Sequence, residues 1–138
     1  MKSIAILGLI ALSACAGTEA GFDVTADHLP PMTGPTSTFA GTVVDPGNGC
    51  LKLEEDDGAL HWLIWPEGTR WEAPHMILPD GAHVTTGDRI DVTGQTLVRS
   101  ELPDGDNPDG KWGSQSGFCL GPAVKADEIL RAAGITVQ

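Results

Sequence analysis

The sequence predicts an all-β protein, built as one small β-barrel with a short C-terminal helix. From Thr38 onward, apolar and polar residues alternate with period two, and clusters of Gly, Pro, Asp and Asn divide the alternation into short segments. Many short strands joined by tight turns are typical of small barrels and sandwiches. Gly41, inside the first of these segments, permits the sharp bend that a barrel corner requires.

Three strands are expected in the first half of this body. Their ranges are 38–44, 50–54 and 59–65. A D-P-G-N-G turn separates the first two strands. The second and third are joined by a turn at Asp57-Gly58, and Asp-Gly is a strong hairpin signal because such turns require positive φ.

Four more strands and the helix are expected in the second half. The strands lie at 76–78, 83–85, 89–98 and 116–120, and a long acidic loop precedes the last of them. The helix is expected at 127–133, because this segment begins with two acids, has Arg131 near its end and is followed by a stop glycine.

The N-terminus has the layout of a secretory signal peptide. Lys2 precedes an apolar run, 4–12, which is too short to span a membrane. The run leads into Leu12-Ser13-Ala14-Cys15, which resembles the lipobox of bacterial lipoproteins. This resemblance implies that residues 1–14 are removed and that Cys15 is acylated. Two or three acyl chains hold a protein stably at a membrane, whereas one does not.

The alternative is an ordinary signal peptide with a chance cysteine. If the lipobox is used and the cell has two membranes, the residue after Cys15 bears on sorting. That residue is Ala16, whereas an aspartate at this position would resemble an inner-membrane retention signal. The periplasmic face of the outer membrane is therefore the favoured location.

Residues 15–37 are expected to form a lipid-anchored, flexible tether, and residues 38–138 the folded domain. The segment is rich in Gly, Thr and Ser, contains three prolines and has no sustained periodicity. Prolines keep such a spacer extended. The alternative is that Phe22 and Val24 dock as a short edge strand.

The two other cysteines, Cys50 and Cys119, remain as an even pair once Cys15 is acylated. Disulfides persist in exported proteins. In the expected strands each thiol lies opposite the flanking apolar residues, so both have the same relation to the core. We therefore expect a disulfide between them. A pair of buried free thiols is the alternative.

The charge of the chain limits its partners. Removing Lys2 with the leader leaves 7 of the 8 Lys and Arg residues against 19 Asp and Glu residues, a formal charge of −12. A nucleic-acid partner is excluded on this ground, because binding phosphates requires a basic surface. Anionic headgroups are repelled as well, so membrane contact is expected through the lipid alone.

Two further patterns bear on the fold. The segment V84-T-T-G-D-R-I-D-V-T-G94 resembles the strand entry of OB-like barrels, which implies an OB-like barrel. In addition, G49-C-L-K-L53 followed by L63-I-W-P66 is similar to a pattern in uncharacterised secreted bacterial domains. That second resemblance implies no activity.

Three residues are candidates for ligand binding: Arg70, Trp71 and Trp112. Exposed aromatic rings can stack on sugars or bases, as they do on OB-folds. The alternative is that these rings only pack within their loops. Trp62 shares a strand face with Leu60 and is expected in the core.

The acidic loop suggests a metal site at Asp104, Asp106 and Asp109, of a type other than the EF-hand. An EF-hand is excluded because Asp109 and Gln115 stand where its glycine and bidentate glutamate belong. A plain solvated loop is the alternative. The four histidines have no zinc-site spacing, and neither a catalytic residue nor a cofactor is predicted.

Together these features predict a lipid-anchored protein of the bacterial cell envelope. The expected role is a non-enzymatic binding or interaction module, whose partner is another envelope protein or a small ligand. The alternative from a different class is a divalent-metal-dependent hydrolase that uses the loop from Asp104 to Asp109. A purely structural envelope protein is a third interpretation.

Overall fold

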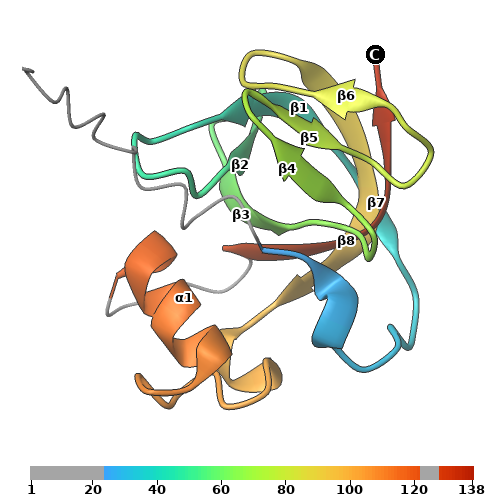
Figure 1. Cartoon of the computed structure of the whole chain (residues 1–138). Coiled ribbons are helices and arrows are strands. Elements are labelled where there is room, and N and C mark those ends of the chain that lie inside the picture. The colour runs from blue at the N-terminus through green and yellow to red at the C-terminus, as the bar shows by residue number, and fades with distance from the viewer. Residues whose placement is uncertain (1–23, 122–127) are drawn as a thin grey trace, which may run out of the picture.

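The computed structural model describes residues 24–121 and 128–138, and these residues are mainly strands (Figure 1). The all-β class is confirmed. The strands are β1 (Ser37–Val44), β2 (Lys52–Glu55), β3 (Leu60–Ile64), β4 (Arg70–Glu72), β5 (His75–Ile77), β6 (His83–Val84), β7 (Arg89–Leu97) and β8 (Ile129–Val137). The helical elements are the helix α1 (Lys111–Leu120) and two 3-10 turns, η1 (Ala26–His28) and η2 (Arg99–Glu101).

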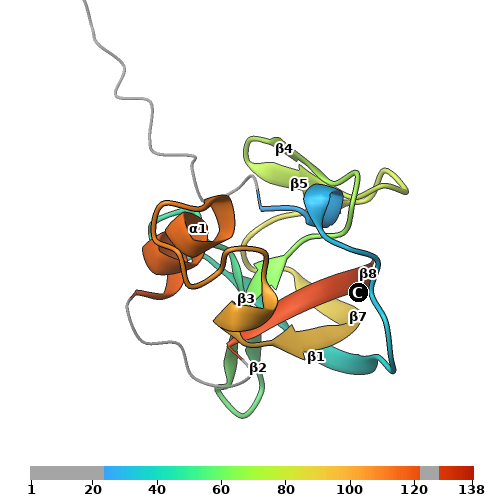
Figure 2. The same cartoon turned by 90° about the horizontal axis from the view of Figure 1, so that it is seen from below.

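Five of the strands form a closed ring of pairings, in the order β1-β2-β3-β8-β7 with β7 paired back to β1. The pair of β3 and β8 is parallel, and the other four pairs are antiparallel. The remaining strands form a separate sheet in the order β4-β5-β6, inserted in the chain between β3 and β7. Figure 2 shows β4 and β5 beside the ring, well apart from α1.

The inner core lies within the ring and follows the period-two alternation of the sequence. Val43 on β1 is the register partner of Leu53 on β2, and both are buried. β7 and β8 contribute Val92 and Leu130, and the small sheet adds Met76. Because alternate residues of each strand point to the same side, the alternation that is visible in the sequence builds this core.

A second, outer core covers the opposite side of β3 and β8. Trp62 and Ile129, which are register partners on these strands, pack here with Trp112 and Cys119 of α1. Val24 from the N-terminal segment completes the cluster. β3 is therefore buried on both of its faces, as is typical of strands in a parallel pair.

The predicted C-terminal helix at 127–133 is wrong, because its described residues enter β8. Leu130 points into the inner core, whereas its neighbour Ile129 belongs to the outer core. A strand covered on both faces has consecutive apolar residues and lacks the alternation that identifies a strand. Residue 127 itself lies outside the described residues.

The predicted strand at 116–120 is also wrong, since these residues form the second half of α1. Trp112, Ser116 and Cys119 are buried and recur at helical spacing on one face. Two internal glycines and the absence of a side-chain cap weaken this helix, so its sequence signal is faint.

Residues 24–36, the described part of the predicted tether, lie against the body. Val24 is fully buried, and its carbonyl accepts a hydrogen bond from the backbone N–H of Trp65 at 2.9 Å. Thr25 and Trp65 form a parallel bridge. Val24 therefore docks on the body, as in the alternative, but through an isolated bridge at Thr25 and not as a strand. Residues 1–23, including Phe22, Cys15 and the leader, lie outside the described residues.

An ion pair between Asp56 and Arg89 links the β2–β3 hairpin to β7, with Nη1 of Arg89 at 2.9 Å from Oδ1 of Asp56. The hydrogen bond and the charge of Arg89 lower the pKa of Asp56. A lowered carboxyl pKa contributes stability above the unfolded pKa, about 4, and that contribution is lost as the pH falls through the folded value.

We therefore expect Arg89→Gln to lower the thermal midpoint at about pH 6. The difference in midpoint between the wild type and this variant, the gap, should be smaller at about pH 3. Thermal melts at the two pH values check this. An equal gap at both would contradict the assignment of the effect to Asp56. Both side chains are well exposed, so the effect is small.

Candidate ligand-binding groove

The structure separates the three residues predicted to bind a ligand. Arg70 is exposed on β4 and pairs with Glu72, and its neighbour Trp71 packs against the inner core. Trp112 is only 3% exposed and belongs to the outer core. The ring of Trp112 is therefore part of the packing between α1 and β3, as in the alternative in which these rings only pack.

The predicted metal site is not assembled either. Asp104, Asp106 and Asp109 are all exposed, and within the described ranges no three carboxylate, His or Cys side chains are placed to hold a metal ion. The loop is instead folded by its backbone. The carbonyl of Asp104 accepts a hydrogen bond from the N–H of Asn107, and the side chain of Asn107 accepts one from the N–H of Asp109.

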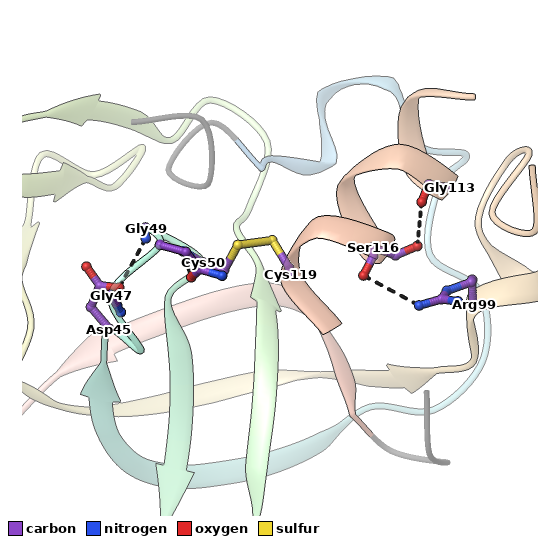
Figure 3. The surroundings of a disulfide bond; sticks show 9 residues. Asp45, Gly47, Gly49, Cys50, Arg99, Gly113, Ser116 and Cys119 are labelled. Carbon is purple, nitrogen blue, oxygen red and sulfur yellow. Dashed lines mark hydrogen bonds between the residues drawn. A yellow bond between two sulfur atoms is a disulfide. The ribbon is translucent and has the colours of Figure 1, made fainter. Parts of the chain in front are cut away.

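A disulfide joins Cys50 to Cys119, with their Cα atoms 5.5 Å apart, as the cysteine count predicts (Figure 3). Cys50 follows a turn in which the carboxylate of Asp45 accepts hydrogen bonds from Gly47 and Gly49. Cys119 lies in α1, not in a strand. The bond therefore fastens α1 onto the start of β2, across the outer core.

The C-terminal end of α1 is fastened a second time, by Arg99. Its guanidinium donates hydrogen bonds to the carbonyls of Ser116 and Gly121, at 3.5 and 2.5 Å. Carbonyls in the last turn of a helix have no partner within it, and a cation there also complements the helix dipole. Figure 3 shows Arg99 and the disulfide on either side of the helix end.

The N-terminal segment continues from η1 as a strap, residues 29–35, across the outer side of β7 and β8. Gln95 and Arg131 are register partners on these two strands. Gln95 donates hydrogen bonds to the carbonyls of Thr33 and Pro35, at 2.7 and 2.9 Å. Arg131 donates to the carbonyl of Pro30 at 2.6 Å. One cross-strand pair thus holds the strap in place.

Two cavities open beside the strap, and together they form the Arg131 groove. Leu29, Pro31, Met32 and Arg131 line both. The β7 cavity, of about 260 Å³, is completed by Pro30, Thr33, Gln95, Leu97, Glu101 and Leu102. The β8 cavity, of about 240 Å³, is completed by Ala26, Pro66, Glu67, Ala132 and Ala133. The groove therefore combines apolar side chains with polar ones around one cation.

The guanidinium of Arg131 has unused hydrogen-bonding capacity. Its Nε is shielded from solvent and has no hydrogen-bond partner, and within residues 24–121 and 128–138 no carboxylate forms an ion pair with it. Burial lowers the pKa of Arg131. A partly desolvated cation without a counter-charge favours the arrival of an anion.

The sequence did not predict this site. The helix expected at 127–133 has Arg131 near its end, and the expected tether contains the prolines of the strap. Leu130 and Ala132 on either side of Arg131 are both buried in the inner core, so a strand here would turn Arg131 outward. The alternation of apolar Leu130, charged Arg131 and apolar Ala132 is the one sequence signal that indicates an outward-facing Arg131 on a strand.

No protein-family model matches the chain, and no match was found among curated proteins or solved structures. In the part of the chain that the structure describes, no helix has the length and apolar character needed to cross a membrane.

Proposed function

We propose that the protein is an exported, lipid-anchored component of the bacterial envelope, and that its OB-like barrel is a non-enzymatic binding module. The observation that carries the binding role is the Arg131 groove, because it combines apolar walls with a cation that no carboxylate pairs with among the described residues. Ligand pockets typically have such walls and a few placed polar groups.

The OB-like character is supported by the order of the strands. Five strands close on themselves with a single parallel pair, and OB-folds are five-stranded Greek-key barrels that bind ligands. The segment that resembles an OB-like strand entry runs from Val84, at the end of β6, to Gly94 on β7. The sheet of β4–β6 and the helix α1 are then insertions into this barrel.

A hydrolase is less well supported. The carboxylates of the loop from Asp104 to Asp109 point into solvent without converging. His61 and Glu55 form an acid–base pair, in which Nε2 of His61 lies 2.5 Å from Oε1 of Glu55. His61 is 5% exposed, and the ring of Phe39 packs against it at 5.4 Å between centroids. A catalytic base must reach its substrate, so this pair suits a structural role better.

The anchor is tested by fractionating cells that express the wild type, Cys15→Ala or the matched control Thr18→Ala, which leaves the lipobox intact. We expect the wild type and the control in the membrane fraction, resistant to high salt and released by detergent. Cys15→Ala should be recovered mainly in soluble form, because the acyl chains provide the membrane affinity. A soluble wild type would contradict the proposal, as would a membrane-bound Cys15→Ala.

A further inference from the structure

We propose that the β7 cavity of the Arg131 groove binds a small monocarboxylate with a short apolar body, its carboxylate on the guanidinium of Arg131. This inference rests on the proposed binding function and specifies its ligand class. It is carried by the position of Arg131 at the border of a cavity that Leu29, Met32 and Leu97 help to line, where the guanidinium has one hydrogen bond, to the carbonyl of Pro30, and no paired carboxylate among the described residues.

The charge of the ligand follows from the charges around the site. A guanidinium matches a carboxylate with two parallel hydrogen bonds, which a neutral group cannot accept with equal strength. The mature chain has a formal charge of −12, since 7 basic residues face 19 acidic ones. A ligand with several negative charges would be repelled by this field, whereas one carboxylate is matched by one arginine.

The body of the ligand follows from the walls. Leu29, Met32 and Leu97 line the β7 cavity with apolar side chains, and the buried Leu102 adds to them. Burying a short hydrocarbon chain against them is favourable, because it removes apolar surface from water. The volume of about 260 Å³ is near the lower end for ligand pockets, so the ligand must be small.

The β7 cavity is preferred to the β8 cavity because of their two glutamates. Glu101, in the β7 cavity, accepts a hydrogen bond from the backbone N–H of Val98 at 2.7 Å and so caps η2. Glu67, in the β8 cavity, has no hydrogen bond or ion pair within the described ranges. The uncompensated charge of Glu67 therefore repels the carboxylate of a ligand more strongly than the hydrogen-bonded Glu101 does.

Calorimetric titration of the full mature chain, purified in a non-ionic detergent, tests the proposal. The probes are butyrate, propylamine with the same alkyl chain and the opposite charge, and inorganic phosphate. We expect saturable binding of butyrate, and a dissociation constant at least tenfold larger for propylamine and for phosphate. Arg131→Gln should raise the butyrate constant at least tenfold. Lys52→Gln, which removes a cation from β2, should leave it within twofold.

A further variant distinguishes the effect of losing the charge of Arg131 on butyrate binding from the effect of loosening the strap. Gln95→Ala removes two hydrogen bonds to the strap and keeps the guanidinium, so its butyrate constant should rise less than that of Arg131→Gln. A rise equal to that of Arg131→Gln would overturn the role of the charge. Binding of phosphate or propylamine that depends on Arg131, without butyrate binding, would overturn the ligand class and leave the binding function standing. Titrations in which no probe binds with any dependence on Arg131 would refute both.

Discussion

Replacing Trp62 with alanine should destabilise the protein by about 3–5 kcal/mol, because large-to-small changes in a core lose both transfer free energy and packing. The side chain of Trp62 is fully buried at the centre of the outer core, between β3 and α1. The loss should appear as a lower midpoint in urea unfolding, followed by circular dichroism. A change within about 1 kcal/mol would be typical of surface substitutions and would contradict the outer core.

Trp62→Phe is the matched control. The indole Nε1 of Trp62 is buried and has no hydrogen-bond partner, and such an unsatisfied donor costs about 1–3 kcal/mol. Phenylalanine removes this donor and keeps a ring against α1. We therefore expect a smaller loss than for Trp62→Ala, although some volume is lost. An equal loss in both variants would indicate that the ring itself contributes little.

Removing the disulfide has the second large effect. Cys50 and Cys119 are 69 residues apart, and a cross-link closing a loop of this length contributes about 4 kcal/mol by restricting the unfolded chain. The double variant Cys50→Ala, Cys119→Ala should lose about this much in urea unfolding. The wild type with its disulfide reduced serves as the control and should unfold at nearly the same midpoint. An unchanged midpoint in both would contradict a bond that constrains the chain.

Much of the ring could be predicted from local patterns. The segment from Thr38 to Val44, the hairpin turn at Asp57-Gly58 and the long strand β7 all show alternation or turn chemistry that acts within a few residues. The cysteine pair could be predicted from the even count that remains once Cys15 is set aside, whereas the strand position expected for Cys119 is wrong. Its pairing is therefore right although Cys119 is in a helix.

The errors have non-local causes. The pattern around Ile129 and Leu130 predicts a helix because β8 is covered on both faces. The parallel pairing of β8 with β3 joins residues that are 67 positions apart in the sequence. α1 is held by the disulfide, by the burial of Trp112 and by Arg99 at its C-terminal end. These are tertiary contacts, so the helix propensity of the α1 sequence does not reveal them.

The Arg131 groove could not be predicted because the helix expected at 127–133 and the tether expected at 15–37 each misplace one of its walls. With residues 127–133 interpreted as a helix and residues 15–37 as a tether, Arg131 and Met32 have no reason to meet. They come together because β8 pairs with β7 and because the carbonyls of the strap are bound by Gln95 and Arg131. The candidate site could therefore not be predicted before the topology was known.

The proposed lipid anchor and the disulfide are tested most directly by one intact-mass measurement. The membrane-extracted chain is alkylated at thiols with and without prior reduction, beside Cys15→Ala. We predict a chain that begins at Cys15, carries added acyl mass, and gains alkyl groups on Cys50 and Cys119 only after reduction. An unacylated chain would contradict the anchor, and alkylation of Cys50 and Cys119 without reduction would contradict the disulfide.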